Sequence, residues 1–131
     1  MGKATKLGIW MDHTTAHVME FTTDPILTKT IQLTSSAEKK ENSFGQNEIM
    51  VHHKEQRLLT DYYKKLAEII RGYEEVLLFG PTDAKVELLN LLKDDHRFSN
   101  VKIIVKQSDK MTENQQHAFV RHHFSKHIIK A

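Results

Sequence analysis

Basic and imidazole side chains gather in the middle of the chain, where residues 51–57 read Val-His-His-Lys-Glu-Gln-Arg. His53, Arg57 and Lys64 are separated by steps of four and seven residues, which puts them near one face of a helix. Such side chains contact phosphate groups and hold a nucleic acid in position without reading its sequence. The segment is therefore a candidate RNA-binding surface, although a solvated helix start would have the same composition. Three more basic side chains lie close by in the sequence: His52, Lys54 and Lys65.

The tripeptide Phe44-Gly45-Gln46 precedes this segment and belongs to a long connection. Residues 34–47 contain Ser, Asn, Gly and a Glu-Lys-Lys-Glu run without apolar periodicity, so we expect a mobile loop over 34–47. Loops of this length in a compact domain are often functional. The second half of the following helix, Leu58–Ile70, carries a broad apolar stripe suited to packing on a sheet. We therefore expect a helix that is anchored at its C-terminal end and projects at its N-terminal end.

The elements that must hold this helix predict an α/β fold. Three strands come first, and helices then alternate with single strands, which predicts a mixed sheet with helices on its faces. This order, a three-strand meander followed by αβαβα, is that of an RNase H-like domain. Turns are expected at 12–15 and 80–82. The expected strands are Lys6–Met11, Ala16–Thr22, Leu27–Leu33, Val76–Phe79 and Val101–Val105, and a capping box at 112–115 starts a last helix that runs to about residue 126.

Composition narrows the class of protein. A chain of 131 residues with 39% hydrophobic residues predicts one domain over residues 1–131 with a sizeable core. The absence of cysteine excludes disulfides and thiolate chemistry. Residues 1–6 lack the apolar region of a secretion signal, and no apolar run approaches a membrane span, so we expect a cytoplasmic protein. The net charge is only +2, but residues 101–131 carry six bases against two acids, which favours an anionic partner.

In the order of its elements and in five stretches, the chain resembles a known family. It is similar to the middle domain of eukaryotic and archaeal class I peptide-release factors, and more so to the small bacterial and archaeal relatives of that domain. The resemblance covers roughly residues 5–125, and its one functionally specific motif is the Gly-Gln step. The matching stretches are Leu7–Asp12, Phe44–Gln46, Tyr62–Glu68, Val76–Pro81 and Thr112–Gln115.

This resemblance implies a role for the loop. In the family the loop reads Gly-Gly-Gln, enters the ribosomal peptidyl-transferase centre and promotes attack of water on the ester of peptidyl-tRNA. Gly45 matches the second glycine and Gln46 the glutamine, so these are the candidate catalytic residues. Phe44 stands in place of the first glycine, where an aromatic ring is able to stack on an exposed base. Two mechanisms stay open: hydrolysis of peptidyl-tRNA, or binding to ribosomal RNA without hydrolysis.

The resemblance also implies partners. The expected ones are the ribosome, through its RNA and peptidyl-tRNA, and a separate decoding or recruiting protein, because full release factors carry codon-reading and partner-binding domains that do not fit in 131 residues. No cofactor, metal or membrane is expected.

Two alternatives come from other classes. An acid at the end of the first strand of an RNase H-like fold often binds magnesium, and Asp12 stands there, with Glu48 and Asp83 as possible companions in a two-metal nuclease. The second alternative is a protein interaction module with no ribosomal role. His123 and His127 are four residues apart on the last helix, but no acid completes a metal site there, and we expect these histidines to face solvent or RNA.

Overall fold

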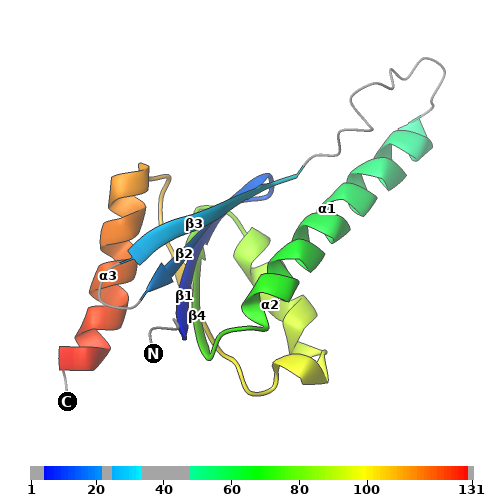
Figure 1. The fold of residues 1–131 in the computed structure, drawn as a ribbon. Helices are drawn as coiled ribbons and strands as arrows, with labels where there is room; N and C mark the ends of the chain where they lie inside the picture. Colours follow the sequence, from blue (N-terminus) through cyan, green and yellow to red (C-terminus); the bar gives the residue numbers. More distant parts are fainter. Residues whose placement is uncertain (1–4, 22–24, 34–47, 130–131) are drawn as a thin grey trace.

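One five-stranded sheet organises the protein. The computed structural model describes residues 5–21, 25–33 and 48–129, which form an α/β, RNase H-like fold with three α-helices (Figure 1). The strands are β1 (Lys6–Met11), β2 (Thr15–Phe21), β3 (Pro25–Gln32), β4 (Glu75–Gly80) and β5 (Lys102–Gln107). The helices are α1 (Glu48–Ile70), α2 (Ala84–Lys93) and α3 (Glu113–Ile129), with a short 3₁₀ turn, η2 (His96–Phe98), before β5.

The sheet has the mixed topology that the sequence predicts. Its strand order is β3-β2-β1-β4-β5. The first three strands pair antiparallel as a meander, whereas β4 pairs parallel with both β1 and β5. The predicted strands overlap the observed ones and differ at their ends by up to two residues. The η2 turn was not predicted, because its stabilising contact, from the Arg97 amide to Asp95 Oδ1 at 3.0 Å, is local and has no periodic signature.

Helices cover both faces of the sheet. Figure 1 shows α1 and α2 on one side and α3 on the other. Strand β4 is buried on both faces, as its continuous apolar run predicts. Val76 and Leu78 belong to the core under α1 and α2, and Leu77 and Phe79 belong to the core under α3. None of the helices in the described ranges is long and apolar enough to cross a membrane.

Helix α1 packs on the sheet through only part of its length. Among the described side chains of α1, residues 56–70, the buried ones begin at Tyr62: Tyr62, Tyr63, Leu66, Ala67 and Ile70. Its N-terminal half extends beyond the edge of the sheet (Figure 1). The prediction of a helix anchored at its C-terminal end is therefore confirmed.

The start of α3 confirms the predicted capping box. The Thr112 amide donates to Gln115 Oε1 at 2.9 Å, and the Gln115 amide donates to Thr112 Oγ1 at 3.2 Å. This pair satisfies two amides that the first turn of a helix leaves without partners. The helix runs to Ile129, three residues beyond the predicted end.

We expect Gly8→Ala to destabilise the protein by about 1–3 kcal/mol, because overpacking forces neighbouring atoms to move. A Cβ at Gly8 would lie 2.5 Å from Val120 Cγ2 of α3. Gly72→Ala is the matched control, since the nearest atom, the Ile69 carbonyl oxygen, would be 3.7 Å away, and its effect should stay within about 1 kcal/mol. Urea unfolding measures both. An unchanged midpoint for Gly8→Ala would contradict the close packing of α3 on β1.

Candidate functional site

The structure places some of the predicted site residues. Phe44, Gly45 and Gln46 lie outside the described residues, as does the whole predicted mobile loop 34–47. The backbone of His52, His53 and Lys54 is part of α1, and their side chains are outside the description. Arg57 and Lys64 are exposed on α1. One continuous helix therefore carries five of the predicted RNA-binding residues.

The helix that carries these residues is not basic as a whole. It contains as many acids as bases, and the exposed Asp61 lies between Arg57 and Lys64 in the sequence. The acids are Glu48, Glu55, Asp61 and Glu68, and the bases are Lys54, Arg57, Lys64 and Lys65. Contact with an anionic partner would therefore depend on which face of the helix it meets, and not on net charge.

Helix geometry sets the distance between the first buried residue of α1 and the start of the helix. Tyr62, the first buried residue along α1 within its described side chains, lies fourteen residues after Glu48. At 1.5 Å per residue this separation is about 21 Å. The first residue of the helix is thus well away from the sheet, and the chain that precedes Glu48 is joined to that remote end.

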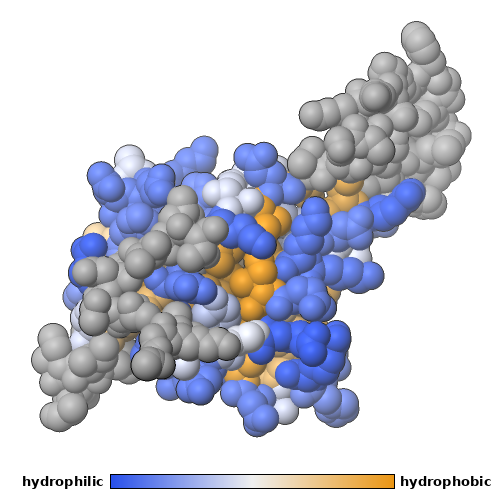
Figure 2. Space-filling model, in the orientation of Figure 1, coloured by the Kyte–Doolittle hydropathy of each residue, from blue (hydrophilic) through white to orange (hydrophobic). Residues whose placement is uncertain are grey.

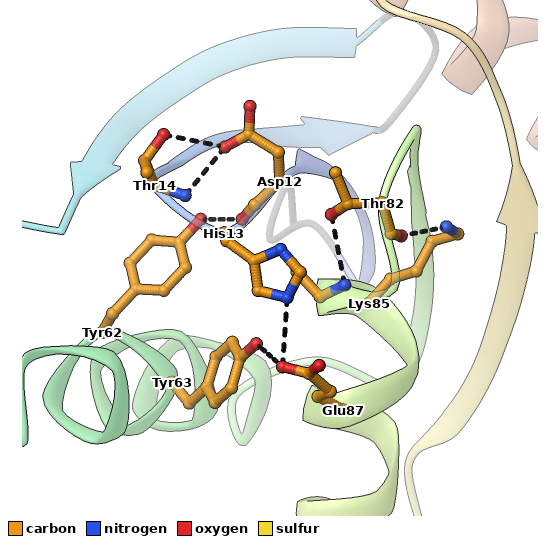
Figure 3. Close-up of polar contacts among 9 residues, drawn as sticks. Asp12, His13, Thr14, Tyr62, Tyr63, Thr82, Lys85 and Glu87 are labelled. Carbon is orange, nitrogen blue, oxygen red and sulfur yellow. Dashed lines mark hydrogen bonds and ion pairs between the residues drawn. The ribbon is translucent and has the colours of Figure 1, made fainter. Parts of the chain in front are cut away.

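A buried tyrosine ties α1 to the end of β1. The Tyr62 hydroxyl donates to the Asp12 backbone carbonyl at 2.7 Å (Figure 3). Asp12 itself closes the β1–β2 turn, because its Oδ1 accepts from the amides of Thr14 at 2.9 Å and Thr15 at 2.8 Å. Burial raises the pKa of Tyr62, so it remains a hydroxyl donor across the physiological range.

The next residue ties α1 to α2. The Tyr63 hydroxyl donates to Glu87 Oε1 at 2.6 Å, and His13 Nε2 lies 3.2 Å from the same oxygen (Figure 3). The hydrogen bond from Tyr63 lowers the pKa of Glu87, with a further contribution from His13, while burial raises the pKa of Tyr63. Three elements, the β1–β2 turn, α1 and α2, therefore meet at one carboxylate.

A buried lysine fastens the turn between β4 and α2. Lys85 is 2% exposed, and its Nζ donates to Gln107 Oε1 of β5 at 2.9 Å and to the carbonyl of Thr82. This turn approaches β1 closely, because a Cβ at Gly80, which has φ +153°, would lie 2.0 Å from the Met11 carbonyl oxygen. Position 80 therefore requires glycine.

Sequence reasoning missed these polar anchors. By their spacing, Tyr62 and Tyr63 belong to the apolar stripe of residues 58–70, but a buried tyrosine hydroxyl also needs a partner and so signals a nearby acceptor. Nothing in the sequence marks Lys85 as buried, since lysine is almost never fully buried.

The acids proposed for a two-metal nuclease are not gathered into one site. Asp12 uses one carboxylate oxygen in its own turn, and Glu48 lies about 21 Å along α1 from the tyrosine that contacts Asp12. Asp83 caps the start of α2 with its backbone carbonyl, which accepts from the amides of Val86 and Glu87. Within the described ranges, no three acidic or imidazole side chains lie close enough together to hold a metal ion.

The expectation that the histidines of α3 face solvent or RNA is wrong for His123. It is 4% exposed and packs edge-on against Phe124, with ring centroids 4.8 Å apart. Its position on the sheet-facing side of α3 explains the burial. The side chain of His127 is outside the description. Trp10, by contrast, lies in the core, and its ring stacks on that of His17 with the ring centroids 5.6 Å apart.

No protein-family model and no curated protein matches the chain. Solved structures share its fold. The Pelota protein of Thermoplasma acidophilum matches with a TM-score of 0.57 and 13% identity, over 89% of this chain and 32% of that one. Pelota of Archaeoglobus fulgidus matches with a TM-score of 0.55 and 10% identity, over 98% and 38% of the two chains. Dom34 of S. cerevisiae, described as a translation termination-like factor of RNA quality control pathways that interacts with Hbs1, matches with a TM-score of 0.53 and 8% identity, over 96% and 38%.

At these identities the likeness concerns the fold. The chain spans about a third of the length of each of these proteins. The fold is thus shared with one part of the two Pelota proteins and of Dom34.

The two tyrosine anchors should respond differently to pH. Because the pKa of Glu87 in the folded protein lies below its usual 4.5, this carboxylate contributes stability above about pH 4.5 that is lost as the pH falls through the lowered pKa. The destabilisation caused by Tyr63→Phe should therefore be largest near pH 7 and shrink as the pH falls below about 4.5 and through the lowered pKa of Glu87. Tyr62→Phe is the matched control, since its acceptor is a carbonyl; its cost of about 1 kcal/mol should not change over this range. Urea unfolding measures both series, and a Tyr63→Phe cost independent of pH would contradict the role of Glu87.

Proposed function

We propose that the protein is a ribosome- or tRNA-associated translation factor that holds the Phe44-Gly45-Gln46 loop against ribosomal RNA. The observation that carries the proposal is the one-sided anchoring of α1: among its described side chains, residues 56–70, the buried ones begin at Tyr62, and the backbone before them extends beyond the sheet (Figure 1). A helix of this kind is able to carry a short loop into a narrow site while the domain stays outside. The fold shared with Dom34, described as a translation termination-like factor, supports the same proposal.

The loop residues have distinct roles in this proposal. Gly45 lets the backbone approach RNA closely. Gln46 helps to shape the site that holds water beside the ester of peptidyl-tRNA, and a backbone amide stabilises the developing oxyanion. Phe44 stacks on an exposed base. A bulky residue in a left-handed conformation costs about 1–2 kcal/mol, so the presence of Phe44 in place of glycine favours binding over hydrolysis.

The basic residues of α1 orient the helix. Arg57 and Lys64 are exposed. The steps of four residues from His53 to Arg57 and of seven from Arg57 to Lys64 place the three near one face of the helix. His52 and Lys54 add contacts nearer the loop. Phosphate contacts from this face would fix the direction of the helix without reading sequence.

A separate decoding or recruiting protein completes the proposal. Dom34, which shares the fold, is described as interacting with Hbs1, which supports a partner of this kind. The cytoplasm is the expected location of the complex.

A release assay on purified ribosomes that hold labelled peptidyl-tRNA distinguishes the two mechanisms, hydrolysis and binding without hydrolysis. If the loop only binds, the protein sediments with ribosomes, releases no peptide, and loses most of its ribosome affinity in Phe44→Ala, because a stacked base contributes about 1–3 kcal/mol. Peptide release that disappears in Gln46→Ala would establish the hydrolase instead. The proposal as a whole fails if the wild-type protein stays out of ribosomal fractions at low and moderate salt.

Phosphate contacts by α1 predict a defined salt response. Arg57→Ala and Lys64→Ala should each weaken ribosome association and reduce the slope of log affinity against log salt by about one unit. Lys93→Ala is the matched control, because Lys93 is an exposed base at the end of α2. Co-sedimentation at several salt concentrations provides the slopes. An equal loss in all three variants would point to a general effect of net charge.

A further inference from the structure

Strand β5 forms one edge of the sheet. It pairs with β4 alone in the strand order of the described chain. All residues of β4 after the first are buried, whereas the second to fourth residues of β5 are only half-buried: Ile103, Ile104 and Val105. Three consecutive aliphatic residues thus stand at an edge that faces away from the other strands.

The direction of the backbone groups of β5 follows from two hydrogen bonds. The Lys102 amide donates to the Glu74 carbonyl, and the Ser108 amide donates to the Gly80 carbonyl, so even-numbered residues point toward β4. Because successive residues of a strand alternate, the amide and carbonyl of Ile103 and of Val105 point outward. Such a row of outward groups is a template for pairing with a further strand.

A cavity flanks β5 on each face of the sheet. On the α2 side, a cavity of about 330 Å³ is lined by apolar residues that include Leu89, Leu92, Phe98 and Ile103. On the α3 side, a cavity of about 370 Å³ is lined by Lys106 and Phe119, among others. Side chains of an added strand alternate between the two faces, so successive residues would enter the two cavities in turn.

The charges of β5 argue against a second copy of the chain as the occupant. Lys102 and Lys106 are exposed and lie symmetrically about Ile104 on the α3 side. Antiparallel pairing of two β5 strands centred on Ile104 would set Lys102 opposite Lys106 twice, and like charges directly opposite are destabilising. The same two lysines would pair with acids four residues apart on another strand.

We propose that β5 is the docking site of an extended segment of a partner protein, in which two acidic residues bracket three apolar ones. The segment adds to the sheet as a further strand. Its backbone pairs with Ile103 and Val105, its acids meet Lys102 and Lys106, and its apolar side chains enter the two cavities. This is strand addition, in which main-chain hydrogen bonds provide affinity and alternate side chains provide specificity. The site is independent of the loop and does not rest on the proposed function.

A capped peptide with the core Glu-Val-Leu-Val-Glu tests the site on the full chain. We expect saturable binding by calorimetry and, by NMR, slowed hydrogen exchange at the amides of Ile103 and Val105, because both become bonded. Lys106→Glu should weaken binding of this peptide about tenfold and improve binding of its Lys-Val-Leu-Val-Lys counterpart. Lys110→Glu is the matched control, an exposed lysine just after β5 with the same change in charge, and it should change affinity less than about twofold.

Three outcomes would overturn the proposal. The first is unchanged exchange at Ile103 and Val105 in the presence of saturating peptide. The second is equal affinity for the acidic and basic peptides. The third is a wild-type dimer in sedimentation equilibrium that itself protects these amides, which would assign the edge to a second copy.

Discussion

The end of the apolar surface on α1 is the constraint on which the rest of the arrangement depends. Burial of apolar side chains is the main force that holds a helix on a sheet, and among the described side chains of α1 those that pack on the core lie between Leu59 and Ile70. Figure 2 shows apolar side chains gathered in a strip in the middle of the molecule between hydrophilic flanks. Residues 52–57 contain no apolar side chain, and the backbone of the helix continues past the sheet (Figure 1).

Hydrogen bonds of buried polar side chains then join α1 and α2 to the turns and strands beside them. The hydroxyls of Tyr62 and Tyr63 would be costly to bury without acceptors, and they find them on two different elements, the turn at Asp12 and helix α2 at Glu87. Lys85 meets the same requirement between the β4–α2 turn and β5. Together these bonds hold the carboxyl ends of β1, β4 and β5 and the base of α1 in one unit.

The sequence was sufficient for the fold because its signals are periodic or local. The stripe of α1, the double-sided burial of β4 and the capping box at Thr112 each have a distinctive spacing, and each was found where expected. The anchors were not predictable, because Tyr63 and Glu87 are 24 residues apart and His13 and Glu87 are 74 apart, and their contact follows only from packing. The burial of His123 was mispredicted for a related reason. Histidine alone says little about which face of a helix it occupies, and α3 has no strong apolar stripe to orient it.

A small tilt of α1 about its packed half produces a larger displacement at its N-terminal end. With an arm of about 21 Å, each degree of tilt at Tyr62 moves the first residue of the helix by about 0.4 Å. The hydroxyl bonds of Tyr62 and Tyr63 to two separate elements add to the apolar packing of Leu66 and Ile70 in restraining this tilt. The position of the first residue of the helix therefore depends on side chains in its second half, far from that residue.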